Sequence, residues 1–242
     1  MIPRTISILG TALLTLFLAP TLGRSQNPSA PEVVAIDHLI LGVSDLDDGV
    51  SQFQRLTGVR PVIGGKHPGR GTQNALVSLG SHEYLEIIAP VPGAELADEF
   101  AALPSMKDLT PIGWAVSSSD IARTAQRLNH GGYETSAPQA GSRVRPDGTR
   151  LEWKSLDISK PSMKVPPFFI QWGKSSLHPS MTSPDGCTLS SLQLAESPSE
   201  PLRNLVLKLG LDVRVSEGGE SVMSLKLRCP SGSVMFPQAP SR

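Results

Sequence analysis

The chain has 242 residues, which is enough for one large domain or two small ones. It carries 22 basic and 22 acidic residues, so its formal net charge is zero, and this balance gives no electrostatic reason to expect nucleic acid or an anionic membrane as a partner. Proline and glycine, with 22 residues of each, predict many turns and some long loops.

The first segment has the layout of a secretory signal. Arg4 supplies a small positive region, a mostly apolar run follows from Ile6 to Leu18, and small or turn-forming residues begin at Ala19. The run is shorter than the roughly 20 apolar residues of a membrane-spanning helix. We therefore predict a signal peptide over residues 1–25, a disordered lead-in over 26–32, and a secreted or extracytoplasmic protein with no stable membrane span after cleavage. The alternative is an uncleaved N-terminal membrane anchor.

A β-α-β-β-β pattern follows in residues 33–92. An extended apolar segment is succeeded by apolar residues at helical spacing, and Gly58 ends the helix. The expected elements are a strand over 33–43, the helix up to Gly58, and strands over 59–63, 73–79 and 83–88.

The same order of elements is predicted twice more, in residues 108–175 and in residues 185–238. The glycines that end the three expected helices, Gly58, Gly131 and Gly210, fall at similar intervals, which indicates a repeat. We therefore predict an α+β fold built from βαβββ modules, with the third module divergent.

Alternation along the strands of the first module separates two kinds of face. Leu39 and Leu41 share an aliphatic face that is expected to pack on the helix. The opposite face mixes apolar residues with a few polar ones, as the wall of a ligand cavity does. Its polar residues are His38, Asn74, Ser78, Tyr84 and Glu86.

His38 and Glu86 are the candidates for chemistry on that face. A lone histidine in an apolar strand is often a hydrogen-bonded core residue, so His38 alone does not decide between structure and function. A carboxylate between Leu85 and Ile87 is costly to bury unless a metal, a cation or a pair of donors accompanies it.

Three motifs in order resemble the glyoxalase-like domain of the vicinal oxygen chelate superfamily. They are Ile36–Leu39, the loop His67–Leu76 and Tyr84–Pro90. The resemblance runs from about Val33 to Trp172. It implies that paired βαβββ modules curl into a half-barrel around a small-molecule cavity.

The resemblance also implies a divalent metal ion (Fe, Mn, Ni, Zn or Mg) that acts as a Lewis acid on oxygen atoms of the substrate. Metal-using members take a histidine from the first strand and a glutamate from the fourth, which correspond to His38 and Glu86; Glu86 would also be the catalytic residue. The second module departs from this pattern, because Gly113 stands opposite His38. Near the counterpart of Glu86, Gln171 offers only an amide oxygen as a ligand.

The substrate would be a small oxygen-rich molecule shaped by Arg70, Asn74 and Tyr84. Three functions stay open: a metal-dependent lyase, isomerase or dioxygenase; a non-catalytic protein that sequesters a small molecule on the same fold; and a scaffold role that uses the third module. Oligomerisation is left open as well, since modules of this kind often pair between chains.

The two cysteines, Cys187 and Cys229, fall in the third module. In the usual order of strands in such a module, the fourth strand lies between the first and the third. Their Cα atoms would then be roughly 9–10 Å apart, beyond the reach of a disulfide. We therefore expect the two cysteines to be unpaired; the alternative is a disulfide, because an exported protein could pair them.

Overall fold

The computed structural model describes residues 34–159, 162–219 and 222–238. The predicted signal peptide and lead-in, residues 1–32, lie outside these ranges. Among the helices of the described ranges, none is long and apolar enough to cross a membrane.

The first module has the predicted order of elements. They are β1 (Ile36–Gly42), α1 (Leu46–Thr57), β2 (Val62–His67), β3 (Thr72–Gly80) and β4 (Glu83–Pro90). The Asp45 side chain caps α1 by accepting a hydrogen bond from Asp48 N (3.0 Å), and Gly58 ends the helix with a φ of 79°, a conformation that favours glycine.

The second module repeats this order with one small additional strand. Its elements are β5 (Thr110–Ser117), α2 (Ile121–His130), β6 (Glu134–Thr135), β7 (Gln139–Val144), β8 (Arg150–Ser159) and β9 (Phe168–Trp172). Two short 3₁₀ turns, Asp98–Phe100 and Leu103–Ser105, lie in the connection between the modules.

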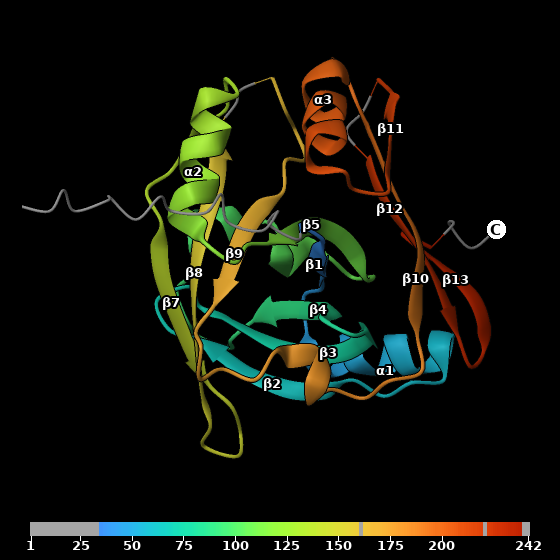
Figure 1. Cartoon of the computed structure of the whole chain (residues 1–242). Coiled ribbons are helices and arrows are strands. Elements are labelled where there is room, and N and C mark those ends of the chain that lie inside the picture. Colours follow the sequence, from blue (N-terminus) through green and yellow to red (C-terminus); the bar gives the residue numbers. More distant parts are fainter. Residues whose placement is uncertain (1–33, 160–161, 220–221, 239–242) are drawn as a thin grey trace, which may run out of the picture. The chain divides into compact units, whose positions relative to one another are not determined.

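The strands of both modules form one curled sheet of nine strands (Figure 1). Its order is β2-β3-β4-β1-β5-β9-β8-β6, and β7 pairs with β8. The antiparallel pair β1–β5 joins the modules, while β1–β4 and β5–β9 are parallel pairs within them. At the far ends of the sheet Arg143 on β7 donates a hydrogen bond to the carbonyl of Gly64 on β2. The α+β half-barrel predicted from the sequence is therefore confirmed.

The prediction of two strand faces in the first module is also confirmed. Leu39, Leu41 and Leu85 are fully buried in a core that includes Val50 and Phe53 of α1. The residues that alternate with them lie on the other face and line a cavity. Alternation of side chains across a strand thus decides which residues enter the core and which line the cavity.

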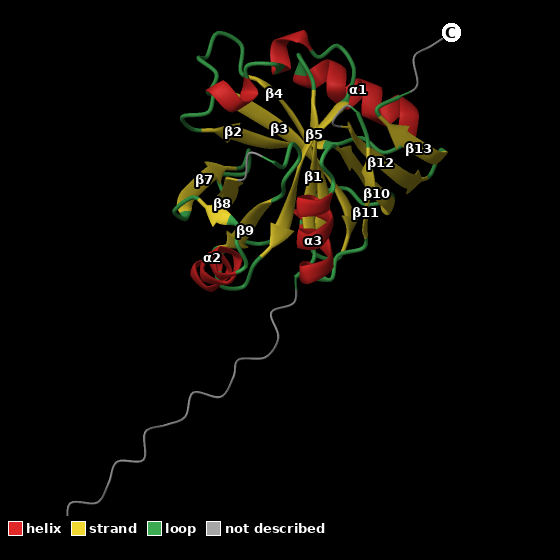
Figure 2. Cartoon of the chain, turned by 90° about the horizontal axis from the view of Figure 1, so that it is seen from above, coloured by secondary structure: helices red, strands yellow, loops and turns green. Residues whose placement is uncertain are grey.

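The third module keeps the order of elements but forms a separate sheet. Its elements are β10 (Thr188–Glu196), α3 (Glu200–Leu209), β11 (Val213–Glu217), β12 (Val222–Cys229) and β13 (Gly232–Phe236). The strand order is β11-β10-β12-β13, so β12 lies directly beside β10. This sheet packs against the first module, with β13 beside α1 (Figure 2). The rings of Phe53 and Phe236 stack at this contact, with 5.9 Å between their centroids.

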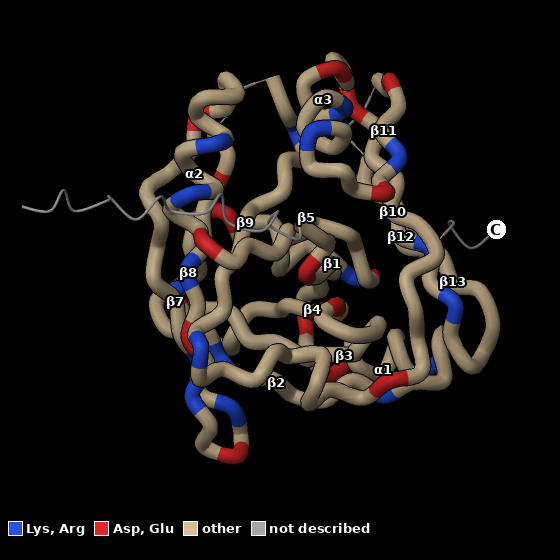
Figure 3. The backbone as a smooth tube through the Cα atoms, in the orientation of Figure 1, with Lys and Arg blue, Asp and Glu red and all other residues tan. Residues whose placement is uncertain are grey.

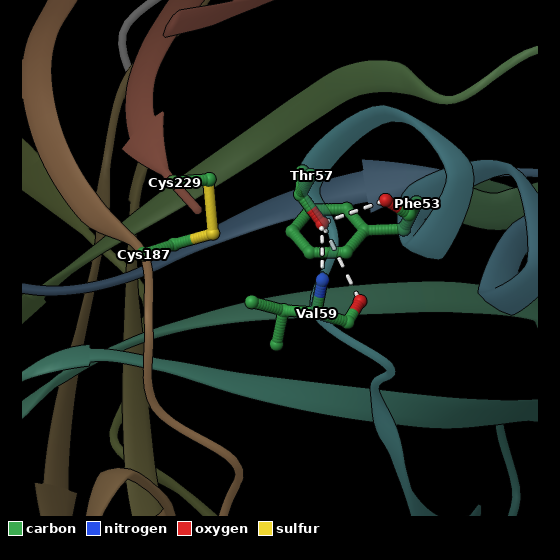
Figure 4. The surroundings of a disulfide bond; sticks show 5 residues. All are labelled: Phe53, Thr57, Val59, Cys187 and Cys229. Atoms are coloured by element: carbon green, nitrogen blue, oxygen red, sulfur yellow. Dashed lines mark hydrogen bonds between the residues drawn. A yellow bond between two sulfur atoms is a disulfide. The ribbon is translucent and has the colours of Figure 1, made fainter. Parts of the chain in front are cut away.

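The expectation of unpaired cysteines was wrong, because it assumed a strand between β10 and β12. The two strands pair directly and bring the Cα atoms of Cys187 and Cys229 to 4.2 Å, and a disulfide joins them. Figure 4 shows this disulfide near the end of α1, where the Thr57 hydroxyl donates to the Phe53 carbonyl (2.7 Å) and accepts from Val59 N (3.1 Å). The disulfide joins the start of β10 to the end of β12, and so stabilises the third sheet near its contact with the first module.

Charged residues of both signs lie on α3 and on the β7–β8 hairpin, whereas α2 carries arginines and no acidic residue (Figure 3). The formal net charge of the whole chain is zero.

Candidate functional site

A cavity of about 580 Å³ lies against the face of β1, β3 and β4 that is turned away from α1, and it extends to β5, β8 and β9 of the second module. All three tryptophans of the chain, Trp114, Trp153 and Trp172, line it. The rings of Trp153 and Trp172 lie 5.7 Å apart. Most of the wall is thus apolar or aromatic, and its polar groups are few enough to be examined one by one.

Glu86 on β4 is the buried carboxylate of this cavity. Its Oε1 accepts a hydrogen bond from Asn74 Nδ2 (2.6 Å) and lies 3.5 Å from His67 Nε2. Burial works to raise the pKa of Glu86, but His67, His38, the Asn74 hydrogen bond and Arg143 together hold that pKa below its usual value. Glu86 is therefore a carboxylate at neutral pH.

His38 on β1 lies beside Glu86 and is held on its other side by Asp37. The distance from His38 Nδ1 to Asp37 Oδ1 is 2.7 Å, and the distance from His38 Nε2 to Glu86 Oε2 is 3.8 Å. The latter exceeds a hydrogen bond. Tyr84 stacks on the His38 ring with 4.5 Å between centroids. His38, Tyr84 and Glu86, all predicted from the sequence, therefore meet in one place.

The side chain of Tyr84 is buried. Its burial, together with the negative charges of Glu86 and Asp37, raises the pKa of its hydroxyl well above the usual value. The hydroxyl consequently stays protonated and uncharged, which makes Tyr84 a stacking partner and hydrogen-bonding group in the site.

Asn74 on β3 was predicted as a substrate-binding residue and lines the cavity. Its Nδ2 is committed to Glu86, while its buried Oδ1 has no hydrogen-bond partner among the described residues. A Cβ atom at residue 64 would collide with this oxygen, so Gly64 makes room for it. A buried acceptor without a donor is costly, and a donor on a bound molecule would satisfy it.

Arg70 and Gln171 have different positions from these residues. Arg70 lines the cavity but is exposed, with its Nη1 4.0 Å from Glu99 Oε1, so it stands at the rim. Gln171 does not line this cavity. Its Oε1 accepts from Ile121 N (3.0 Å) and its Nε2 donates to Ser119 O (3.0 Å) at the start of α2. The structure therefore does not bring Gln171 to His38 and Glu86.

Strand alternation explains the position of Gln171. Phe168, Ile170 and Trp172 of β9 turn toward the cavity, and the residues between them turn toward the helix side. The pairing of the strands places Phe168, and not Gln171, at the position that Glu86 has in the first module: Ala115 pairs with Phe168 as Ile40 pairs with Glu86. The cavity residue of the second module that corresponds in position to Glu86 is hence apolar.

Gly113 lies on the cavity side of β5 and pairs with Ile40. A Cβ atom added there would meet only the Cδ1 atom of Ile40, at 3.6 Å. The position is open but supplies no ligand. Within the described ranges no group of three His, Cys, Asp or Glu side chains is arranged to hold a metal ion. The residues present match two ligands of the implied metal and do not complete the set.

Two residues that sequence reasoning did not select also face the cavity. His67, the first residue of the loop motif His67–Leu76, ends β2; its Nδ1 lies 3.0 Å from Thr72 Oγ1, and burial lowers its pKa. Arg143 on β7 is buried and its positive charge acts on Glu86. Both positions depend on the contact between β2 and β7, which lie far apart in the sequence. A local sequence pattern does not predict such a contact.

His178 is a further residue whose place was not predicted. It lies in the segment after β9, is 7% exposed, and its Nε2 is 3.3 Å from Asp37 Oδ2. Trp172 Nε1 donates to the same carboxylate oxygen (3.1 Å). His178 contacts Asp37 but is not among the residues that line the cavity of His38 and Glu86.

Comparisons with known proteins agree with the fold described above. The model of the glyoxalase-like domain family matches residues 36–210. A search of curated proteins found no match. Among solved structures, a hypothetical protein from Staphylococcus aureus is similar with a TM-score of 0.62 and 17% identity, covering 78% of this chain and 88% of that one.

Two further structures are similar at lower scores. Methylmalonyl-CoA epimerase from Mycobacterium tuberculosis has a TM-score of 0.40 and 19% identity, with 59% of this chain and 90% of that chain covered. A hypothetical protein from Bacillus halodurans has a TM-score of 0.42 and 14% identity, with 60% and 96% covered. Likeness at this level does not bear on the chemistry of the cavity.

Proposed function

Because this chain belongs to the glyoxalase-like domain family, we propose that it binds a small, largely apolar, oxygen-bearing molecule in its cavity, with a hydroxyl group of that molecule between His38 and Glu86. Binding of this kind is the function that the arrangement of the cavity supports best. It needs no group beyond those that the described residues provide.

One observation carries the proposal: two hydrogen-bond acceptors converge without a donor between them. Asp37 is ionised and can only accept, so in the neutral form of His38 the hydrogen is on Nδ1 and the lone pair of Nε2 faces Glu86. Glu86 Oε2 is itself an acceptor and lies 3.8 Å away. A hydroxyl donor placed against this pair would satisfy an acceptor that is otherwise unpaired.

The remainder of the cavity supports an apolar body for the ligand. Trp153 and Trp172 form one part of the wall, and Ile40 and Ile88 form another. Burial of a small ring against such a wall contributes about 25 cal/mol for each Å² of apolar surface removed from water. A planar ring with one hydroxyl therefore serves as a suitable probe.

The test compares two probes that differ only in the hydroxyl donor, 4-ethylphenol and 4-ethylanisole. Binding is followed by the fluorescence of the three cavity tryptophans. We expect the phenol to bind about 10- to 100-fold more tightly, as a hydrogen bond to a charged group predicts. Glu86→Gln should abolish this preference, because the glutamine amide can itself donate to His38. The exposed residue Glu134, changed to Gln, is the charge-matched control and should keep the preference.

Equal affinity of the wild-type protein for the two probes would overturn the proposed hydroxyl site. So would a preference that survives in Glu86→Gln. Absence of any tryptophan response to either probe, in a protein that is folded by circular dichroism, would overturn the cavity as a binding site for molecules of this class.

A metal-dependent enzyme is the second candidate function. The observation that favours it is Asp37 behind His38, since a carboxylate on the outer nitrogen of a ligating histidine is common in metal sites. His38 and Glu86 would be the protein ligands, and the ion would supply Lewis-acid chemistry. Elemental analysis of the purified chain decides: one equivalent of Fe, Mn, Ni, Zn or Mg that is lost in His38→Ala and Glu86→Ala supports the enzyme.

Export is proposed together with either function. Two observations support it: the signal-like sequence before residue 26, and the disulfide between Cys187 and Cys229, a bond typical of oxidising compartments. Mass spectrometry of the protein from the culture medium and from membranes tests the proposal. A chain that keeps residues 1–25 and fractionates with membranes would instead support the anchor.

A further inference from the structure

We infer that His178 is a positioning residue for the cavity: through Asp37 it fixes which nitrogen of His38 carries the hydrogen, and so makes His38 an acceptor toward the ligand. The inference rests on the proposed function, since it concerns the same pair His38 and Glu86. His178 itself touches no ligand, because it lies behind the cavity wall.

The chain of hydrogen bonds starts from a donor whose direction cannot change. The backbone N–H of Ser180 donates to His178 Nδ1 at 3.2 Å. The Ser180 hydroxyl also lies 2.8 Å from this nitrogen, and it accepts in turn from the backbone N–H of His82 at 3.1 Å. His178 Nδ1 is therefore an acceptor, and the hydrogen of the neutral ring is on Nε2.

The next step passes through Asp37, which is 1% exposed. His178 Nε2 lies 3.3 Å from Asp37 Oδ2, and Trp172 Nε1 donates to the same oxygen at 3.1 Å. A carboxylate that receives two donors on one oxygen is ionised and oriented, so its other oxygen can only accept. That oxygen, Oδ1, faces His38 Nδ1 at 2.7 Å.

The direction of the chain is thereby transmitted to the cavity. Since Asp37 accepts from Nδ1, neutral His38 presents the lone pair of Nε2 to Glu86 Oε2, 3.8 Å away. Without the donor on His178, Asp37 would be held by Trp172 alone. It could then turn away from His38, whose two tautomers would become similar in energy.

Packing holds His178 in the position that this role requires. Its ring lies 5.5 Å from the ring of Tyr84 and 5.6 Å from that of Trp172. The segment that carries it is fastened to β3, where Ser78 N donates to Pro184 O at 2.8 Å. Ring packing alone would be met equally well by phenylalanine, so the hydrogen-bonding role and a purely structural role are separable.

The test uses the full chain labelled with ¹⁵N-histidine, without ligand, at mildly alkaline pH. The chain has five histidines, so each imidazole can be resolved, and the His38 signals are identified by their loss in His38→Asn. We expect the wild-type His38 to be in the Nδ1–H tautomer. In His178→Phe, which keeps a ring but lacks the donor, both tautomers should be populated. His178→Gln, whose amide can donate to Asp37, should restore the first.

The preference for 4-ethylphenol over 4-ethylanisole should change in parallel, falling several-fold in His178→Phe and recovering in His178→Gln. If His178→Phe does not fold, the smaller variant His178→Leu also lacks the donor to Asp37 Oδ2 and should mix the tautomers in the same way. An unchanged His38 tautomer in the variant that folds would overturn the inference. A wild-type protein with the expected tautomer but no phenol binding would overturn only the proposed function, so the two failures are distinguishable.

Discussion

In the first module the parallel pair β1–β4 turns His38 and Glu86 toward the cavity, whereas the corresponding pair β5–β9 of the second module turns Gly113 and Ile170 toward it. The hydrogen-bonded frame is the same in both modules. The first supplies the ionisable groups, and the second supplies much of the apolar and aromatic wall. A repeated backbone therefore does not imply a repeated site, and each half has to be examined by its own side chains.

Arg143 is the exception to this division. It belongs to the second module, yet its guanidinium reaches Gly64 of β2 and its charge acts on Glu86. The separation of roles thus has one bridging residue, and variants of each kind should respond differently.

The largest expected effect is a loss of stability from the apolar half. Trp114 is 1% exposed, and its Nε1 donates to Val165 O (3.0 Å). Trp114→Ala should lower the free energy of unfolding by about 3–5 kcal/mol, because it removes a large buried side chain and leaves a cavity. Urea unfolding followed by circular dichroism measures this. Trp114→Phe, which keeps most of the ring, should lose less than half as much; a loss below about 1 kcal/mol in Trp114→Ala would contradict the assignment of this residue to the core.

The bridging arginine comes next. Arg143→Met keeps the aliphatic stem but removes the donor to Gly64 and a positive charge near Glu86. The free energy of unfolding at neutral pH should therefore fall by about 2–3 kcal/mol. The pKa of Glu86 lies below its usual value in the folded protein, so its stabilising contribution is present above the unfolded pKa and is lost as pH falls through the folded one. The effect of the variant should accordingly shrink in strong acid.

Arg145→Met is the matched control for that experiment. Arg145 is also buried, and its Nη2 donates to a backbone carbonyl, that of Leu177 (3.2 Å), but it is not among the main causes of the lowered pKa of Glu86. Its loss of stability should be the same at both pH values. Equal pH dependence in the two variants would show that Arg143 does not act on Glu86.

The sequence predicted those features of the two modules that depend on interactions between residues close together in the chain. Alternation along β1, β3 and β4 correctly separated Leu39 and Leu41 from His38, because the period of a strand is a local property. The α+β half-barrel was predicted in the same way, by pattern and resemblance together.

Interactions between distant segments were not predictable in this way. Even the contact between the neighbours Asp37 and His38 depends on a distant strand: the carboxylate of Asp37 faces the ring of His38 where the pairing of β1 with β5 shifts register, between Ile36 and His38. His178 meets Asp37 across 141 residues of sequence, and Arg143 meets Gly64 across 79. The pairing of Cys187 with Cys229 depended on strand order, which the sequence of the third module did not reveal.

A smaller effect tests whether the pH sensitivity belongs to the first module. Burial, and then the negative charge of Asp37, raise the pKa of Glu83 from 4.5 to about 7. A raised carboxyl pKa opposes folding once the group ionises, so the stability that protonated Glu83 allows is complete below pH 4.5 and is lost as pH rises toward 7. Because the side chain is partly exposed, we expect about 1–2 kcal/mol over this interval.

Glu83→Gln should remove that decline and leave the protein more stable at neutral pH. Chemical unfolding at several pH values across the interval measures the difference. The exposed Glu134, changed to Gln, removes the same charge from the second module and should leave the decline in place. If Glu83→Gln shows the wild-type slope, the pH sensitivity has another source.

The smallest expected effect would make the two modules alike. A side chain at position 113 has open space toward the cavity, where its Cβ would meet only Ile40 Cδ1 at 3.6 Å. Gly113→His should add a third nitrogen or oxygen donor to His38 and Glu86 and raise the affinity for Co²⁺ at least about tenfold, which corresponds to about 1.4 kcal/mol. Absorption of the cobalt ion reports both affinity and coordination. Gly113→Phe has a ring of similar size without a donor and should show no gain, so a gain in both variants would reflect a change of shape. A gain in neither would mean that the halves differ in backbone position as well as in side chains, and that glycine at this position is not what separates this chain from metal-binding members of its family.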